Sequence, residues 1–261
     1  MQVSIVIPAY KQAKTIVKDL ERVKNALEEL KEDYEIIVVC DGTLDNTFEE
    51  AGKLKSTKIK VYGYEGANRG KGYALRYGTA RATGELICFL DSGMEINPKG
   101  ISLLLEKLRW NDDDIVIASK LHPESKVNYP LQRRITTHGY RFLIRLLFGL
   151  RIKDTQTGLK LFKRKVLEKV MPRLLVKAYA IDIEILALAH HFGFTKIEEA
   201  PVEVTYNFGD LAHAANLKPI LRMIQDTLAV FYRLKILRYY DDNNKRKWTY
   251  DKELEMRINT P

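Results

Sequence analysis

Short apolar runs alternate with amphipathic segments along the first half of the chain. The apolar runs predict buried strands, and segments whose apolar residues recur every three to four positions predict helices. This alternation predicts an α/β fold with a mostly parallel sheet and helices on both faces. The expected strands cover residues 3–8, 34–40, 58–64, 85–90 and 114–119, and the expected helices cover 15–32, a short stretch from 47, and 70–82, with a further helix capped by Asn97.

The second half of the chain contains two long, basic, amphipathic segments, residues 141–152 and 217–237. Each is expected to lie on an anionic membrane surface or to pack on the core with an exposed charged face. No run reaches the roughly 18 apolar residues that a membrane span requires, so no transmembrane helix is expected. The last 21 residues are polar and are expected to be frayed.

The chain carries 43 Lys and Arg against 34 Asp and Glu, a formal charge of +9. This charge suits an anionic partner, such as nucleic acid, lipid headgroups or a phosphorylated substrate, or it serves only solubility. No nucleic-acid motif is present and the aromatic residues lie in apolar periodic segments, so no nucleic acid is expected as a partner. Cys40 and Cys88 lie inside apolar runs and are expected to be free core thiols, which, with no signal peptide in view, favours a cytoplasmic protein.

Polar residues follow three of the expected strands: Pro8 to Tyr10, Asp41 with Gly42, and Asp91. Parallel strands end at one edge of a sheet, and ligands of open α/β sheets bind at that edge. The first turn lacks the Gly-x-Gly-x-x-Gly fingerprint, and "GANRGKG" has neither the spacing nor the hydroxyl of a phosphate loop. We interpret this segment as a glycine-rich turn in which Arg69 and Lys71 form an anion-friendly corner at a helix N-terminus.

Five motifs occur in an order that resembles the inverting glycosyltransferases of family 2: "VSIVIPAY", "VVCDGTLDNT", "ANRGKGYALRYG", "LICFLDSG" and "KDTQTGLKLFKR". The chain looks most like the dolichyl- and polyprenyl-phosphate mannosyl- and glucosyltransferases. The resemblance covers residues 2–206 and implies a Rossmann-like catalytic domain of the GT-A type. We place this domain at residues 1–210, followed by a C-terminal helix and polar tail at 211–261.

The resemblance also implies the partners of such an enzyme. They are a nucleotide-sugar donor (GDP-mannose or UDP-glucose, with mannose favoured), Mg²⁺ or Mn²⁺, and a polyprenyl phosphate acceptor. The enzyme is expected to lie on the cytoplasmic face of a membrane, either by peripheral contact or through a separate membrane subunit. A family 2 transferase that acts on a saccharide or glycolipid hydroxyl is the alternative, and it would need a general base.

The resemblance assigns nucleotide-sugar contacts to Pro8, Ala9, Tyr10, Asp41, Gly42, Asn68, Gly70, Lys71, Asp91 and Ser92. The sequence departs from the family pattern where Gly93 replaces the second carboxylate of the metal-binding Asp-x-Asp, where Lys11-Gln12 replaces Asn-Glu, and at Cys40. Side chains alternate along an extended strand, so Asp91 and Glu95 would point the same way. We hypothesise that Glu95 supplies the missing metal ligand; otherwise it is only a charge before the next helix.

Residues on the acceptor side follow the fifth expected strand. Lys120 ends this strand, and Arg133 with Arg134 begins the next helix, so these cations are expected to hold the acceptor phosphate or to form a solvated basic face. The resemblance places Asp154, Gln156 and Thr157 at the floor of the sugar and acceptor pocket, with a plain turn as the alternative.

Asp182 and Glu184 are two residues apart on an expected helix, so at most one of them faces the cleft. The resemblance selects Asp182 as a sugar-positioning residue or base, which completes a catalytic set with Asp91 and the three cations. Glu184 is expected to be a surface or cap charge. The five histidines show no metal-ligand spacing and are interpreted as structural or surface residues.

Overall fold

The structure is a computed structural model that describes residues 2–30, 32–93, 95–127, 131–176, 180–205, 217–244 and 246–260. Within these ranges, the side chains of residues 131–138, 217–220 and 260 are outside the description. The predicted boundary at residues 210 and 211 also lies outside the described residues and stays a prediction.

A seven-stranded sheet in the order β3-β2-β1-β4-β7-β5-β8 forms the centre of the molecule. β7 runs antiparallel to both of its neighbours, while the other pairs are parallel. The predicted mostly parallel sheet is therefore confirmed. The strands are β1 (Val3–Ala9), β2 (Tyr34–Cys40), β3 (Ile59–Gly63), β4 (Leu86–Leu90), β5 (Ile115–Ala118), β7 (Leu159–Lys163) and β8 (Ile197–Ala200).

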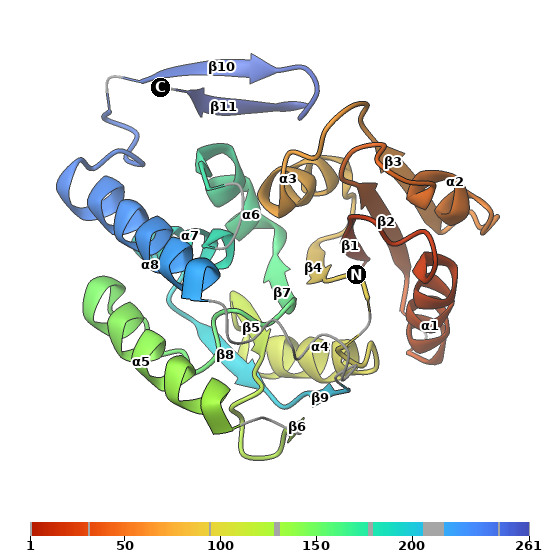
Figure 1. Ribbon diagram of the computed structural model, residues 1–261, viewed down its shortest axis with the longest axis horizontal. Helices are drawn as coiled ribbons and strands as arrows, with labels where there is room; N and C mark the ends of the chain where they lie inside the picture. Colours follow the sequence, from red (N-terminus) through yellow and green to blue (C-terminus); the bar gives the residue numbers. More distant parts are fainter. Residues whose placement is uncertain are drawn as a thin grey trace.

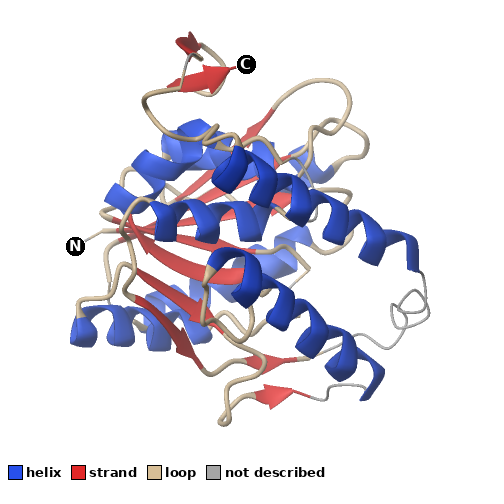
Figure 2. Ribbon diagram, turned by 90° about the vertical axis from the view of Figure 1, so that its left-hand side faces the viewer, coloured by secondary structure: helices blue, strands red, loops and turns tan. Residues whose placement is uncertain are grey.

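Helices cover both faces of the sheet (Figures 1 and 2). One core lies under α1, α2 and α4, and the other lies under α3 and α5 to α8. β2 shows the period of two that this arrangement requires, because Ile36 and Val38 join the first core while Ile37 and Val39 join the second. The helices are α1 (Ile16–Glu29), α2 (Thr47–Gly52), α3 (Lys71–Arg81), α4 (Gly100–Asn111), α5 (Leu131–Phe148), α6 (Arg164–Val170), α7 (Ile181–His191) and α8 (Leu217–Phe231).

Shorter elements connect this frame. A turn of 3₁₀ helix (Met171–Arg173) follows α6, and a π-helical turn (Tyr232–Ile236) extends α8. β6 (Lys126–Val127) and β9 (Glu203–Val204) form a small parallel ribbon. α4 begins at Gly100, later than expected, because Asn97 first forms a turn in which its Oδ1 accepts the Lys99 backbone N–H at 3.1 Å.

The C-terminal residues form an ordered hairpin, so the expectation of a frayed tail is wrong. β10 (Lys247–Asp251) pairs antiparallel with β11 (Met256–Thr260), next to α3 and α6 in Figure 1. Leu254 at its turn is 1% exposed, and Glu253 binds Arg69 at 2.6 Å. The polar composition of this segment concealed the tertiary contacts that order it.

Glu35 is a buried carboxylate that ties neighbouring strands to the start of β4. Its Oε1 accepts hydrogen bonds from the Ser4 hydroxyl and from both the backbone N–H and hydroxyl of Thr83, and its Oε2 accepts one from Lys60. Burial would raise the pKa of Glu35, but these four hydrogen bonds lower it from 4.5 to about 2. The lowered pKa stabilises the fold above the unfolded-state value, and this stabilisation is lost as pH falls from about 4.5 to about 2.

Replacing Glu35 by glutamine is expected to lower the free energy of unfolding at pH 7 by about 2 kcal/mol. The difference should shrink toward pH 3, since wild-type Glu35 then loses part of its charge-dependent advantage. Urea unfolding at the two pH values measures both quantities. Glu50→Gln, which breaks an exposed pair with Lys53, is the matched control and should cost less than about 1 kcal/mol. An equal loss at pH 7 and pH 3 for Glu35→Gln would contradict the linkage.

Candidate active site

A cavity of about 520 Å³ opens beside the end of β4. The chain must pass very close to Asp91 here, since a Cβ on Gly158 would lie 2.2 Å from the Asp91 Oδ2. Gly158 also accepts the Asp91 backbone N–H at 3.0 Å. Five of the predicted site residues line this cavity: Asp91, Ser92, Glu95, Lys120 and Gln156. β4 therefore delivers the Asp91 carboxylate to a cavity, and the role of these residues in ligand binding stays a prediction.

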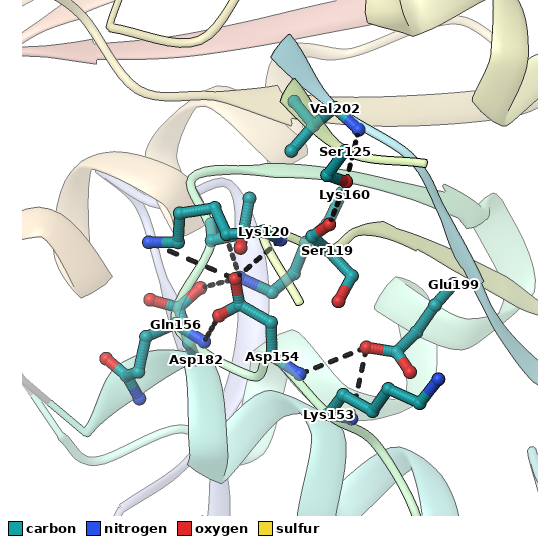
Figure 3. Close-up of polar contacts among 11 residues, drawn as sticks. Ser119, Lys120, Ser125, Lys153, Asp154, Gln156, Lys160, Asp182, Glu199 and Val202 are labelled. Atoms are coloured by element: carbon teal, nitrogen blue, oxygen red, sulfur yellow. Dashed lines mark hydrogen bonds and ion pairs between the residues drawn. The ribbon is translucent and has the colours of Figure 1, made fainter. Parts of the chain in front are cut away.

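A chain of alternating charges extends from Asp91 into the protein. Lys71 Nζ lies 2.8 Å from Asp91 Oδ1 and 3.3 Å from Asp182 Oδ2. The other oxygen of Asp182 binds Lys160 Nζ at 2.6 Å (Figure 3). Lys160 is 1% exposed and also donates to the backbone carbonyl of Thr157. These ion pairs therefore join the first residue of α3, the second residue of α7 and the second residue of β7.

The ion pairs hold Asp182 in its charged form. Burial would raise its pKa, but Lys160 and Lys71 outweigh that effect and lower the pKa below its ordinary value. Burial would lower the pKa of Lys71, yet Asp182 and Asp91 raise it. For Lys160 burial prevails, and the pKa is lowered despite Asp182. A carboxylate with a lowered pKa and two ammonium partners is a weak proton acceptor, so the geometry suits Asp182 for positioning rather than for base catalysis.

A second network, made of hydrogen bonds to backbone N–H groups, fixes the acceptor-side motif around Asp154 and Gln156 (Figure 3). Asp154 accepts the Lys120 backbone N–H at 3.0 Å and the Gln156 backbone N–H at 3.2 Å. Glu199 on β8 accepts the backbone N–H groups of Lys153 and Asp154, each at 3.0 Å. Asp154 therefore fixes the positions of Lys120 and Gln156, and the residue itself is only 5% exposed.

Gln156 and Thr157 differ in what they present to the cavity. Gln156 lines it, and its Nε2 is a buried donor without a hydrogen-bond partner in the described structure. Such a donor is costly unless a ligand or water accepts its hydrogen bond. Thr157 is fully buried and turns its carbonyl toward Lys160. Of the three predicted floor residues, Gln156 is thus the one in position to touch a ligand directly.

The predicted donor residues meet where β1 and β2 end side by side. The backbone N–H of Asp41 donates to the carbonyl of Ala9 at 2.8 Å, which places Pro8 to Tyr10 next to Asp41 and Gly42. The Asp41 carboxylate accepts hydrogen bonds from the Tyr64 hydroxyl and from the backbone N–H groups of Arg69 and Gly70. Asp41 consequently shapes the glycine-rich turn that carries Asn68, Gly70 and Lys71.

The two cations of this turn are already paired, in contrast to the open anion-friendly corner expected from the sequence. Arg69 donates to the Tyr73 hydroxyl at 2.7 Å and to Glu253 of the C-terminal hairpin at 2.6 Å. Its guanidinium also lies 4.9 Å from the ring centroid of Tyr64. Lys71 is bound by Asp91 as described above. Arg69 thus joins the hairpin to the donor side of the site.

The cavity offers hard oxygen ligands for a divalent cation. Asp91 and Glu95 both line it, as the metal hypothesis requires. Mg²⁺ commonly takes one or two protein carboxylates together with substrate phosphates and water. No group of three or more His, Cys, Asp or Glu with metal-binding geometry occurs within the described residues. The residues present fit a site that substrate phosphates complete, and the role of Glu95 stays a prediction.

The remaining predictions concern two arginines of the acceptor side and the carboxylate of Glu184. Arg133 and Arg134 belong to the first turn of α5, but their side chains lie outside the described residues. Glu184 is 0% exposed, so the expected surface or cap charge is wrong. Its carboxylate accepts the Tyr240 hydroxyl at 2.6 Å and the Val176 backbone N–H at 2.9 Å. A tyrosine far along the chain completes this site, and sequence spacing gives no sign of it.

Lys160 is the site residue that the sequence analysis missed. A signal was present, because a lysine stands inside the apolar run "LKLF". Lysine is almost never fully buried unless it is paired, so a lysine in a buried strand predicts a carboxylate partner. The identity of that partner, Asp182, depends on the packing of α7 against β7 and could not be read from the sequence.

Comparison with solved structures identifies the class of this fold. Glucosyl-3-phosphoglycerate synthase from Mycobacterium tuberculosis, in complex with Mn²⁺, uridine-diphosphate and phosphoglyceric acid, matches 100% of this chain and 87% of its own with a TM-score of 0.66. The identity is 20%, so the likeness shows the fold alone. It confirms the expected Rossmann-like domain of the GT-A type.

Sequence comparison identifies the family. The profile described as Glycosyl transferase family 2 matches residues 4–171. A dolichyl-phosphate beta-glucosyltransferase of Drosophila melanogaster is 33% identical over 216 residues, which cover 77% of this chain and 66% of that protein. One of Saccharomyces cerevisiae is 30% identical in an alignment of 267 positions that covers 93% of this chain and 77% of that protein. The chain belongs to glycosyltransferase family 2, and it is a glycosyltransferase as the sequence analysis expected.

Proposed function

We propose that this enzyme transfers glucose from UDP-glucose to a polyprenyl phosphate at a membrane surface, with the aid of a divalent cation. The observation that carries the proposal is the cavity in which Asp91, Lys120 and Gln156 converge, in a chain at least 30% identical to two dolichyl-phosphate beta-glucosyltransferases. The sequence analysis favoured mannose, and the names of these relatives move our proposal to glucose. GDP-mannose is retained as an arm of the test.

The donor is placed along the edge formed by β1, β2 and β4. Three segments surround the nucleotide: Pro8 to Tyr10, Asp41 with Gly42, and the turn from Asn68 to Lys71. Ser92, which follows Asp91 in the chain, contacts the diphosphate. Asp91, with Glu95 as the second ligand, would hold Mg²⁺ or Mn²⁺. When bound, the cation supplies neutralisation of the charge that develops on the leaving nucleoside diphosphate.

The acceptor is proposed to be a phosphate because the site offers cations and a weak base. A phosphate oxygen attacks the anomeric carbon from the face opposite the diphosphate, so that the new carbon–oxygen bond forms as the bond to the diphosphate breaks, with inversion. The attacking oxygen is already ionised and needs orientation rather than deprotonation. We propose that Lys120, Arg133 and Arg134 orient this oxygen. The lowered pKa of Asp182 agrees with a positioning role for that carboxylate.

The membrane contact is assigned to the exposed side of α5 and α8, which lie side by side (Figures 1 and 2). The Tyr140 hydroxyl binds the Thr227 hydroxyl at 2.8 Å across these helices. Within the described ranges, no helix has the length and apolar content needed to span a bilayer. Exposed apolar and basic side chains on these helices and the adjoining π-helical turn define the α5–α8 face: Phe142, Arg145, Leu146, Leu221, Arg222, Tyr232, Lys235, Ile236 and Leu237.

Replacing Phe142 and Leu146 together by glutamate is expected to weaken binding to anionic vesicles at least tenfold. Their exposed fractions are 69% and 70%, and burying one such side chain in an apolar medium is worth roughly 1.5–3 kcal/mol. Co-sedimentation with phosphatidylglycerol vesicles measures the affinity. The matched control is Trp110→Glu, since Trp110 is 91% exposed and belongs to α4, which covers the other face of the sheet from α5 and α8. Equal losses in both variants would contradict the assignment.

Donor choice is tested with purified enzyme, polyprenyl phosphate in vesicles and Mn²⁺. UDP-glucose and GDP-mannose are supplied in separate reactions, and the lipid products are identified by mass spectrometry. We expect a hexosyl lipid from UDP-glucose at least tenfold faster than from GDP-mannose. The reverse preference would restore mannose, and a product only on a hydroxyl acceptor would support the alternative reading.

A further inference from the structure

The ammonium of Lys71 forms an ion pair with Asp91, the carboxylate that the family pattern assigns to metal binding. Lys71 Nζ lies 2.8 Å from one oxygen of Asp91 and 3.1 Å from the other, so it binds both. Asp91 is also the more exposed partner, with 43% of its side chain accessible against 27% for Lys71. The lysine therefore approaches from the protein side and leaves the open side of the carboxylate to the cavity.

The charges around Lys71 balance without any metal. Asp91 and Asp182 carry two negative charges, and Lys71 and Lys160 carry two positive charges, within contacts of 2.6–3.3 Å. Gly93 removes the second carboxylate that the family pattern would add beside Asp91. A divalent cation that entered alone would thus find Asp91 already neutralised by an ammonium, and only the proposed contact with Glu95 would add a further negative charge.

Coulomb repulsion opposes this entry. Mg²⁺ lies about 2.1 Å from its oxygen ligands, so a cation on Asp91 would approach within roughly 4 Å of the Lys71 ammonium. Like charges at that distance repel strongly in a partly buried site. A nucleoside diphosphate changes the balance, because its negative charges compensate the cation and give Lys71 phosphate oxygens as new partners. Lys71 meanwhile keeps its contact with Asp182.

We propose that Lys71 is a resident counter-ion that prevents Asp91 from holding a divalent cation until a nucleoside diphosphate is bound. Cation and diphosphate then bind cooperatively, and each raises the affinity of the other by the same factor. The proposal rests on the proposed function for the identity of the nucleotide only. It makes Lys71 responsible for the order in which the site is filled, in addition to its contact with the donor.

The test measures Mn²⁺ binding directly, without turnover. Electron paramagnetic resonance quantifies free Mn²⁺ in the presence of wild-type protein, Lys71→Met and Lys71→Arg, each with and without UDP. Without UDP, Lys71→Met should bind Mn²⁺ at least about tenfold more tightly, a change of about 1.4 kcal/mol, whereas Lys71→Arg should resemble the wild type. UDP should strengthen Mn²⁺ binding far more in the wild type than in Lys71→Met.

Controls separate the possible outcomes. Lys165→Met removes a lysine that pairs with Asp114 at 3.0 Å on another part of the surface, and it should leave Mn²⁺ affinity unchanged. Circular dichroism checks the fold, and Lys71→Gln replaces Lys71→Met if the latter fails to fold. Unchanged or weaker Mn²⁺ binding without UDP in the neutral variant would overturn the proposal. An absence of UDP binding to the wild type would overturn the proposed donor, while the measurement with Mn²⁺ alone still decides the role of Lys71.

Discussion

Replacing Asp91 by asparagine is expected to reduce the rate of sugar transfer by about 10³-fold or more. Loss of a single preorganised group that stabilises developing charge costs about 10² to 10³ in rate, and Asp91 is also the proposed principal ligand of the cation. Asparagine retains the size and one oxygen of the side chain, so the close approach of Gly158 is preserved. The quantity to measure is kcat with UDP-glucose and polyprenyl phosphate at saturating Mn²⁺.

The matched control for this variant is Asp112→Asn. Asp112 is an exposed carboxylate that pairs with Lys196 at 3.5 Å, far from the cavity residues. It should leave kcat within about twofold, in line with the small effect of surface ion pairs. A decrease of less than tenfold in Asp91→Asn, with an unchanged melting temperature, would remove Asp91 from the centre of the mechanism.

Replacing Lys160 by methionine is expected to lower the free energy of unfolding by about 3–5 kcal/mol. Removal of one partner from a buried ion pair leaves an uncompensated charge, which costs about this much. Lys160 is 1% exposed, holds Asp182 at 2.6 Å and caps the carbonyl of Thr157. Transfer should fall as well, because Asp182 then keeps only the longer contact with Lys71. Urea unfolding and kcat measure the two effects.

A double-mutant cycle separates the ion pair from the loss of packing. Asp182→Asn together with Lys160→Met removes both charges, so the double variant should be at least about 1 kcal/mol more stable than the sum of the single effects. Lys169→Met is the surface control, since its pair with Asp242 is exposed, and it should cost less than about 1 kcal/mol. Strict additivity of Lys160→Met and Asp182→Asn would show that the pair is not coupled.

Local patterns in the sequence were sufficient to predict most of the sheet. The run "YEIIVVC" gives β2 its observed bounds, because six of its seven residues are apolar, and such a run favours a strand that is buried on both faces. The position of Asp91 was also predictable, since a carboxylate directly after a buried strand must lie at the carboxyl edge. Both inferences depend only on neighbours in the chain.

Features that depend on distant contacts were not predictable in the same way. The antiparallel insertion of β7 between β4 and β5 brings Lys160 to Asp182, and no local pattern encodes a strand order. Glu184 is buried because Tyr240, 56 positions later, donates to it. The polar C-terminal segment is ordered because Glu253 reaches Arg69. In each case the deciding partner lies far away in the sequence.

We propose that the lipid phosphate, and not a hydroxyl, receives the sugar. The most direct measurement supplies purified enzyme with radiolabelled UDP-glucose, Mn²⁺ and vesicles that contain either a polyprenyl phosphate or the corresponding polyprenol. We expect rapid labelling of the phosphate lipid, with the β configuration shown by NMR, and labelling of the alcohol at less than about one hundredth of that rate. Equal or faster labelling of the alcohol, or transfer only to an added saccharide, would show that the acceptor is not the lipid phosphate.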